Sequence, residues 1–406
     1  MSRKSDKIDT GQPLVSRSAH DASASGLGYL YQFQYALLVA LKRGKTDPEL
    51  RVSIEVCDDI GLVQGPGEHP VQIKHHLSGG TLTDKSKDVW TTFAVWMDAE
   101  PQDHEPTRLL ITTQSVQANS GVSHLRDGLL DVVAAESKLL SAGRGSRDKT
   151  TEAIRSRFCS LDTAARRAFL QTVVIIGDAP HVMDIRQAIE AELMMGMPRN
   201  GRELFLDLLL GWWNEKVLQM LAKMVDCVAF DEIYAKVQDI RDEFTAENLP
   251  SFELEPREGQ MEALTAQFQE YRFVDQLRWI DFPTKSIQKA IVDYYQAVTH
   301  TDRWCTENLV AIDEISRYER RLVDEWERVF DRMCDGLPSE ATEDDKRVVA
   351  KEMLWALLDR SELQIRARYE PDFYRRGTFH SLADSHRAGW HPDFKAKILD
   401  MLDQSA

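Results

Sequence analysis

This chain has few cysteines and only short apolar runs. Both features limit the classes of protein to which it can belong. No stretch of about 18 or more apolar residues is present, and no signal-peptide core follows Met1, so we expect a cytoplasmic protein that does not associate with a membrane. The cysteines lie far apart and form no CxxC pair, which argues against a zinc site and against a disulfide framework. They are Cys57, Cys159, Cys227, Cys305 and Cys334.

Basic residues are also in the minority, since 50 Lys and Arg residues stand against 66 Asp and Glu residues and give a formal net charge of −16. This balance argues against a protein coated in positive charge, although a local groove on an acidic protein can still attract nucleic acid. The hydrophobic fraction of 43% is that of an ordinary folded protein. A chain of 406 residues is long for a single core, so two or three domains are expected.

Three segments of different character follow one another along the chain. Residues 1–24 are polar, and we expect a flexible arm there. Residues 25–200 alternate helical and strand patterns, which predicts an α/β domain. Residues 201–406 read almost entirely as helices and predict a mainly α-helical C-terminal domain. No internal repeat of fixed period interrupts this organisation.

The spacing of apolar residues places the expected elements of the α/β segment. Leucines recur at helical intervals before Gly44, which predicts a helix that ends there. Two strands, residues 51–63 and 71–76, flank a turn-rich stretch, and a helix around Trp90 follows. Further buried strands are expected over residues 108–115 and 172–178.

The first two strands carry charges where a hairpin normally has apolar or neutral residues. Glu55, Asp58 and Asp59 lie on the first strand, with Asp59 expected inside the strand, and Lys74 lies on the second. One interpretation is a solvated hairpin with a cross-strand salt bridge to Lys74. The other is a metal site, because strand alternation puts Gln72 and Lys74 on one face, where a carboxylate ending the first strand can meet both.

The second interpretation supplies the parts needed for phosphodiester hydrolysis. Magnesium prefers oxygen ligands, which suggests Asp59 as a ligand and Gln72 as a carbonyl ligand or orienting group. Lys74 can stabilise negative charge on the phosphate or help to deprotonate the attacking water. Gln32, a polar position on an otherwise apolar helix, precedes this hairpin in the sequence.

The Asp…Gln-x-Lys pattern resembles the PD-(D/E)xK nuclease superfamily, in the glutamine variant of Mrr-like restriction endonucleases. Four segments, SGLGYLYQFQYALLVAL, IEVCDDIGLV, VQIKHH and DVWTTFAVW, together resemble the nuclease domain of the dsDNA endonuclease effectors of CBASS anti-phage systems. The resemblance implies a restriction-endonuclease-like fold, a mixed sheet flanked by helices, with Mg²⁺ or Mn²⁺ as cofactor and double-stranded DNA as substrate. It also implies catalytic roles for Gln32, Glu55, Asp59, Gln72 and Lys74, and metal ligation by Asp59, Gln72 and Glu55, with the choice between Asp58 and Asp59 left open.

The densest basic cluster of the chain falls in residues 144–167. One interpretation is a segment that binds DNA phosphates beside the nuclease site, which would make DNA binding depend on salt concentration. The other is a solvated, arginine-rich helix, and the sequence favours neither. The expected DNA-binding residues are Arg144, Arg147, Lys149, Arg155 and Arg157, and Arg166 and Arg167 continue the cluster.

The helical half carries no pattern typical of a catalytic site. Its late histidines, His380, His386 and His391, have spacings that fit a zinc site poorly, and Trp212 and Trp213 are expected in a core or an interface. Residues of about 200–400 resemble the C-terminal domains of ABC-three-component proteins, the effector subunits of Lamassu-type defence systems. That resemblance implies an SMC-like ABC ATPase and a small middle component as partners, which hold the effector inactive. It further implies release, assembly into a homo-oligomer, expected to be a tetramer, and DNA cleavage.

Two other functions remain open from the sequence. The nuclease-like domain can be a catalytically inactive scaffold that binds DNA or partners within the same complex. Alternatively, the nuclease acts on RNA, although no aromatic RNA-stacking motif supports that substrate.

Overall fold

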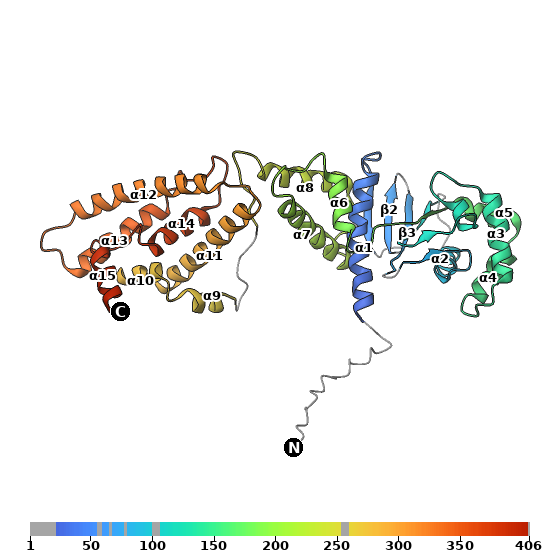
Figure 1. The fold of residues 1–406 in the computed structure, drawn as a ribbon, viewed down its shortest axis with the longest axis horizontal. Coiled ribbons are helices and arrows are strands. Elements are labelled where there is room, and N and C mark those ends of the chain that lie inside the picture. The colour runs from blue at the N-terminus through green and yellow to red at the C-terminus, as the bar shows by residue number, and fades with distance from the viewer. Residues whose placement is uncertain are drawn as a thin grey trace, which may run out of the picture. The chain divides into compact units, whose positions relative to one another are not determined.

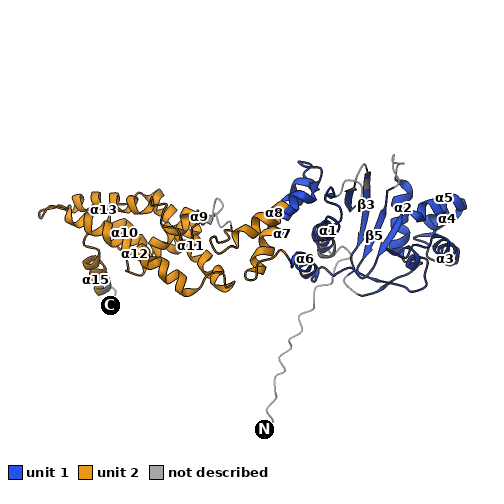
Figure 2. Ribbon diagram, turned by 90° about the horizontal axis from the view of Figure 1, so that it is seen from above, with its two compact units in different colours: residues 1–195, 210–234 blue, residues 196–209, 235–406 orange. Residues whose placement is uncertain are grey.

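The chain forms two compact units, each described here by itself (Figure 2). The structure, a computed structural model, describes residues 22–54, 59–64, 67–76, 79–99, 106–252 and 260–404. The first unit comprises residues 1–195 and 210–234, and the second comprises residues 196–209 and 235–406. The sequence suggested one division at residue 200, whereas helix α7 (Arg202–Leu221) contributes residues to both units. The expected arm, residues 1–24, lies almost wholly outside the described residues.

The first unit contains a six-stranded mixed sheet, as the α/β prediction required (Figure 1). Its strand order is β7-β5-β3-β2-β1-β8. Strands β1, β2 and β3 are antiparallel neighbours, whereas β5 and β7 run parallel to β3. A separate two-stranded sheet pairs β4 (Thr81–Leu82) with β6 (Ser115–Val116). The strands of the main sheet are β1 (Arg51–Ile54), β2 (Ile60–Gln64), β3 (Gly67–Lys74), β5 (Arg108–Thr112), β7 (Val173–Ile176) and β8 (Val228–Ala229).

The expected single strand over residues 51–63 is wrong, because this stretch is itself a hairpin. Ile54 of β1 pairs with Ile60 of β2, so the chain reverses between them. Residues 55–58, which include Glu55 and Asp58, lie outside the described residues. Asp59 lies in a bend directly before β2 and not inside a strand. The β-branched pattern is the same for one long strand and for two short ones, so the sequence pattern does not distinguish them.

Helices cover both faces of the sheet (Figure 2). Helices α1 (Ala22–Arg43) and α6 (Ile185–Leu193) lie on one face, and α2 (Lys87–Asp98), α3 (Val132–Gly145), α4 (Glu152–Ser160) and α5 (Thr163–Gln171) lie on the other. A short 3-10 helix, Val122–Leu125, leads into α3. Helix α2, expected from the sequence around Trp90, buries Val89, Trp90, Phe93 and Trp96. These side chains form one core with Leu110 of β5 and the apolar residues of α3–α5.

The second unit is helical throughout its described residues, which confirms the prediction of a mainly α-helical C-terminal part. Its core joins aromatic and aliphatic side chains of all the helices from α9 to α15. Among the described helices of the chain, none combines the length and apolarity needed to cross a membrane. The helices are α8 (Phe230–Glu243, whose first turn belongs to the first unit), α9 (Gln260–Phe268), α10 (Arg272–Trp279), α11 (Thr284–Thr306), α12 (Ile312–Asp335), α13 (Glu343–Leu358), α14 (Asp372–Asp384) and α15 (Phe394–Gln404).

Candidate functional site

The candidate site lies where the parallel strands β3, β5 and β7 end. Because parallel strands share a direction, their carboxyl ends meet at one edge of the sheet, the edge at which α/β folds commonly bind ligands. Backbone bonds continue the sheet past the strand ends, since the N–H of Thr113 donates to the carbonyl of Lys74 at 3.4 Å and that of Ala179 to Thr112 at 3.1 Å. The side chains that follow Lys74 are therefore held in place.

Asp59 is fixed against this edge by two hydrogen bonds. Its Oδ2 accepts from the backbone N–H of Ile73 at 2.8 Å, and its carboxylate also accepts from the side-chain amide of Gln32 on α1. Burial raises the pKa of Asp59 above its ordinary value, and the bond from Ile73, the charge of Lys74 and the bond from Gln32 oppose that rise. Gln32 and Lys74 therefore both act on the Asp59 carboxylate.

Gln72 and Lys74 point to the face of the sheet that α2 covers. Gln72 is paired in register with Leu110, and Lys74 with Thr112. Side chains at paired positions project to the same side, and Leu110 belongs to the core beneath α2. Gln72 is 7% exposed, whereas Lys74 is partly exposed.

The salt-bridge interpretation of the hairpin gains no support from the described residues. Lys74 forms no ion pair with any carboxylate in the part of the chain that the structure describes. Glu55 and Asp58, the other acidic residues of the hairpin, fall outside that part, so the choice between Asp58 and Asp59 remains a prediction. Asp59, in contrast, contacts the edge directly.

Two consecutive histidines after Lys74 belong to this edge, and sequence reasoning missed both. The ring of His75 lies 4.5 Å from that of Tyr31 on α1 and 6.0 Å from that of His181, measured between centroids. Burial, together with His181 and His76, lowers the pKa of His75. His76 turns to α2, where its Nε2 lies 2.6 Å from Oδ2 of Asp88. The letters HH directly after Gln-x-Lys were the available signal.

The donor set at the edge suits a hard divalent cation. Asp59 offers a carboxylate in a site partly removed from water, and Gln72, which precedes the Ile73 that binds Asp59, carries a buried side-chain amide. Carboxylate and amide oxygens are the protein ligands that Mg²⁺ and Mn²⁺ prefer. A cation bound there would offset the desolvation that raises the pKa of Asp59, because it would stabilise the ionised carboxylate.

The basic segment divides into structural and exposed residues, which corrects the prediction for Arg155. Arg155 is 5% exposed, and its guanidinium donates to the carbonyls of Gly143 at 2.6 Å, Ser146 at 3.0 Å and Asp148 at 2.5 Å. It therefore holds the α3–α4 connection and has no surface to offer to DNA. Arg157 is exposed but is engaged by the carboxylate of Asp98.

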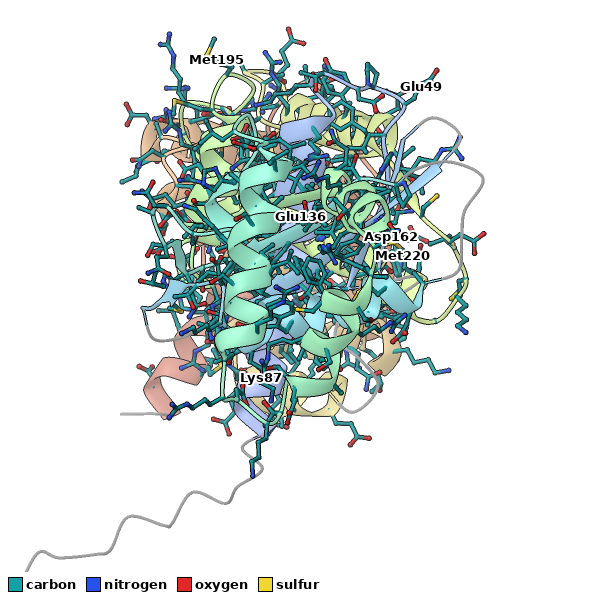
Figure 3. All side chains as sticks on the ribbon, turned by 90° about the vertical axis from the view of Figure 1, so that its right-hand side faces the viewer. Glu49, Lys87, Glu136, Asp162, Met195 and Met220 are labelled. Carbon is teal, nitrogen blue, oxygen red and sulfur yellow. The ribbon has the colours of Figure 1, made fainter. Side chains whose placement is uncertain are left out.

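Two further arginines of the segment brace α5 against α3. Arg166 and Arg167 both donate to the buried carboxylate of Glu136, at 2.9 and 2.7 Å. Their charges and hydrogen bonds lower the pKa of Glu136; Figure 3 labels this residue of helix α3. Three cluster members, Arg144, Arg147 and Lys149, remain exposed around the α3–α4 loop.

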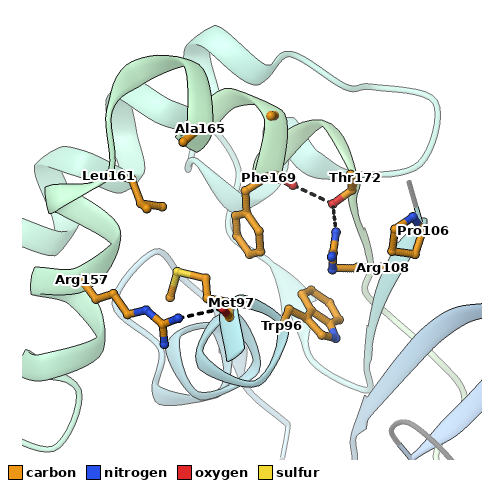
Figure 4. A pocket seen from close by; sticks show the side chains of 10 residues that line it. Trp96, Met97, Pro106, Arg108, Arg157, Leu161, Ala165, Phe169 and Thr172 are labelled. Atoms are coloured by element: carbon orange, nitrogen blue, oxygen red, sulfur yellow. Dashed lines mark hydrogen bonds between the residues drawn. The ribbon is translucent and has the colours of Figure 1, made fainter. Parts of the chain in front are cut away.

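A cavity of about 370 Å³ opens at the opposite end of β5 and β7 (Figure 4). Trp96 and Phe169 line it, together with two arginines. Arg108 donates to Oγ1 of Thr172 at 2.6 Å and lies over the ring of Phe169, at 5.9 Å. Because Arg108 begins β5, this cavity is remote from the carboxyl-end edge and adds nothing to the candidate site.

A cluster of Glu343, His391 and Asp393 in the second unit has the composition of a metal site but not its hydrogen bonding. The backbone N–H of Asp393 donates to Nδ1 of His391 at 3.0 Å, so a neutral ring carries its proton on Nε2, which faces Glu343 at 3.3 Å. Lys397 and Lys346 already neutralise the two carboxylates, at 2.9 and 2.7 Å. In this structure the cluster is a set of ion pairs that joins the start of α13 to the start of α15.

The comparison with known proteins identifies the C-terminal part of the chain. Residues 273–398, which cover α11–α14 with most of α10 and the start of α15, match the family described as C-terminal domain 7 of the ABC-three component (ABC-3C) systems. No curated protein matches the chain. The family match supports a place for this chain among the components of an ABC-3C system.

Proposed function

We propose that the chain is a divalent-metal-dependent nuclease that hydrolyses double-stranded DNA as the effector of an ABC-3C defence system. The observation that carries this proposal is the position of the Asp59 carboxylate. Gln32 and the backbone of Ile73 hold it against the strand that presents Gln72 and Lys74. A carboxylate, an amide and an ammonium group at one strand end are the groups that metal-assisted phosphodiester hydrolysis requires.

Each of these residues has a distinct role in the proposed reaction. Asp59, Gln72 and Glu55 would hold the metal, which supplies Lewis-acid stabilisation of phosphate charge when bound. Gln32 keeps the Asp59 carboxylate in its orientation through its side-chain hydrogen bond. Lys74, on the same face as Gln72, lies where it can stabilise the additional negative charge of the transition state.

The C-terminal match supports the remainder of the proposal, the assembly in which the nuclease works. A component of a three-part system has partner subunits, for which we propose an SMC-like ABC ATPase and a small middle component. The partners hold the nuclease inactive, because uncontrolled DNA cleavage harms the host. Release allows the chain to assemble with copies of itself, as a tetramer, and to cut DNA in the cytoplasm.

A second candidate, a catalytically inactive scaffold within the same system, is favoured by the burial of Asp59. Desolvation raises the pKa of this carboxyl group, which disfavours the ionised form that binds a cation. An acidic residue retained only to close the hairpin onto Ile73 would have this environment as well.

Cleavage of supercoiled plasmid with Mg²⁺, with Mn²⁺ and with EDTA tests the proposal. We expect metal-dependent nicking and linearisation, lowered about 10²–10³-fold by Lys74→Ala through loss of transition-state stabilisation. Asp59→Asn should abolish metal dependence and activity together. Matched controls are Lys85→Ala and Asp127→Asn, which change exposed residues of the same unit. Equal cleavage by the wild type and the Lys74→Ala protein would leave the scaffold as the better account, and cleavage of RNA alone would change the substrate class.

A further inference from the structure

His76 holds a fixed position beside the candidate site although it follows the last residue of β3. Its backbone N–H donates to Oγ1 of Thr113 at 3.0 Å, and the same hydroxyl donates to the His76 carbonyl at 3.2 Å. Thr113 follows Thr112, the register partner of Lys74. The chain therefore keeps its alternation, and His76 projects to the same face as Gln72 and Lys74.

Asp88 meets His76 from the first turn of α2. The distance between His76 Nε2 and Asp88 Oδ2 is 2.6 Å, and the two side chains are 34% and 25% exposed. The helix N-terminus stabilises the charge of Asp88. This turn is anchored, because the indole of Trp90 donates to the carbonyl of Asp84 at 2.9 Å, so the carboxylate is presented by a rigid element.

A carboxylate on one nitrogen of a histidine sets the proton position of the ring. The short distance to Asp88 keeps a proton on Nε2, which leaves Nδ1 of the neutral ring as a proton acceptor. His75 lacks this arrangement, since its ring faces Tyr31 on the opposite side of the sheet and its Nε2 lies 3.4 Å from the backbone N–H of Val182. Of the two histidines, only His76 shares a face with Lys74.

We infer that His76, oriented by Asp88, is the general base that takes the proton from the attacking water. This inference rests on the proposed nuclease function and gives His76 and Lys74 separate roles. His76 accepts the proton, and Lys74 keeps its charge and stabilises the phosphate. As the water oxygen bonds to phosphorus, its proton passes to Nδ1 of His76. The bond from phosphorus to the leaving oxygen breaks, its electron pair stays on that oxygen, and solvent supplies a proton to it. The imidazolium then returns its proton to solvent.

Single-turnover cleavage of plasmid DNA by the full-length chain tests this role. We expect His76→Ala to slow cleavage about 10²–10⁴-fold, the usual contribution of a general base. Added imidazole should restore part of the rate of the His76→Ala protein and none of the rate of the Lys74→Ala protein. Asp88→Asn should slow cleavage less and shift the pH–rate profile, because the ring remains but loses its orienting charge. The titratable groups that interact with the ring and bear on this profile are Asp88 and His75; Lys74 lies two residues before His76 on the same strand face.

Controls and contrary outcomes are distinct for the two proposals. His386→Gln changes an exposed histidine of the second unit and should leave the rate unchanged. Suppose that the wild type cleaves DNA and Lys74→Ala does not, whereas His76→Ala and Asp88→Asn cleave at the wild-type rate with the wild-type pH profile. That result would overturn only the role of His76. Absence of metal-dependent cleavage in the wild type would overturn the proposed function and this inference with it. A slow His76→Ala protein that imidazole does not restore, with a normal profile for Asp88→Asn, would make His76 a structural residue.

Discussion

At the scale of single residues, Arg155 is the clearest case of a charged side chain used for structure. Its guanidinium is planar and offers donors in fixed directions, and here these directions match the carbonyls of Gly143, Ser146 and Asp148, in addition to Oγ1 of Thr151. A loop that turns between α3 and α4 leaves carbonyl groups without helical partners. Arg155 satisfies them from within the protein.

Arg155→Ala should destabilise the first unit by about 3 kcal/mol, because it removes a buried, fully used guanidinium and leaves several carbonyls without a donor. Denaturant unfolding of the full chain measures this destabilisation. Arg147→Ala, in the same basic segment but exposed, is the matched control and should change stability by no more than about 0.5 kcal/mol. An Arg155→Ala protein as stable as the control would show that the loop carbonyls find solvent instead.

Under the proposed nuclease function, the exposed members of the basic segment are the candidates for contacts with DNA. They are Arg144, Arg147 and Lys149. Replacing all three with Ala should weaken DNA binding and reduce the slope of log affinity against log salt by about 0.9 for each phosphate that the protein no longer neutralises. Fluorescence anisotropy with a duplex at several salt concentrations measures the slope. An unchanged slope would favour the alternative interpretation, a solvated basic loop.

At the scale of elements, the α11–α14 pair shows how close packing depends on one glycine. A Cβ on Gly377 of α14 would lie 2.0 Å from the carbonyl oxygen of Asp293 on α11 and 2.6 Å from Cβ of Ala297. Real atoms do not approach so closely, and the obstacle is mainly backbone, which cannot move aside as a flexible side chain can. Glycine therefore sets the distance between these two helices.

Gly377→Ala should destabilise the second unit by about 2–3 kcal/mol or more, because the helices must separate and pack less closely. Gly211→Ala is the matched control, since Gly211 is an exposed helical glycine with open space at its Cβ position. That control should be neutral or stabilise the protein by about 0.5–1 kcal/mol through its higher helix propensity. Thermal unfolding of both variants beside the wild type decides the comparison, and two equal melting temperatures would contradict the packing argument.

The same elements show what the sequence can predict and what it cannot. The helix around Trp90 follows from local apolar spacing, and the structure has helix α2 there. The grouping of Gln32 and Asp59 came from a family resemblance and not from spacing. The contact of His76 with Asp88 and those of Arg155 with the loop carbonyls join residues 7–12 positions apart. Such contacts form only in the folded chain, and no local sequence pattern predicts them. The reversal between β1 and β2 was missed because β-branched residues favour strands of either length.

At the scale of the whole molecule, buried histidines make the stability of the second unit depend on pH. Burial lowers the pKa of His300 to about 4 and that of His380 to about 3, and it also lowers the pKa of His391. His300 is held as the neutral ring, because its Nε2 accepts from the N–H of Phe252 at 3.2 Å while Nδ1 lies 2.7 Å from the carbonyl of Gln296. Asp293 acts in the opposite sense, since burial raises its pKa to about 6.

The signs of these shifts determine the expected pH dependence. A histidine whose pKa is lower in the folded protein binds its proton more readily when unfolded, so its contribution is present above about pH 6.5 and is lost as the pH falls. At pH 5, His300 and His380 should each cost about 2 kcal/mol relative to pH 7.5. The Asp293 carboxyl group is protonated more readily in the folded protein, so it should restore roughly 1–2 kcal/mol over the same range. The loss of stability from the two histidines exceeds the gain from Asp293, so the second unit should become less stable on acidification.

His380→Phe provides the sharpest check of this balance. The ring of His380 lies 5.4 Å from that of Phe273 and 6.1 Å from that of Trp390, so phenylalanine keeps a planar ring among aromatic neighbours and removes the titrating group. Denaturant unfolding at pH 7.5 and pH 5 should show a loss of stability in the wild type that is about 2 kcal/mol smaller in the variant. His386→Gln, which removes an exposed histidine, should retain the wild-type difference. A wild-type protein equally stable at both pH values would mean that the buried rings accept protons without cost, because water reaches them when they become charged.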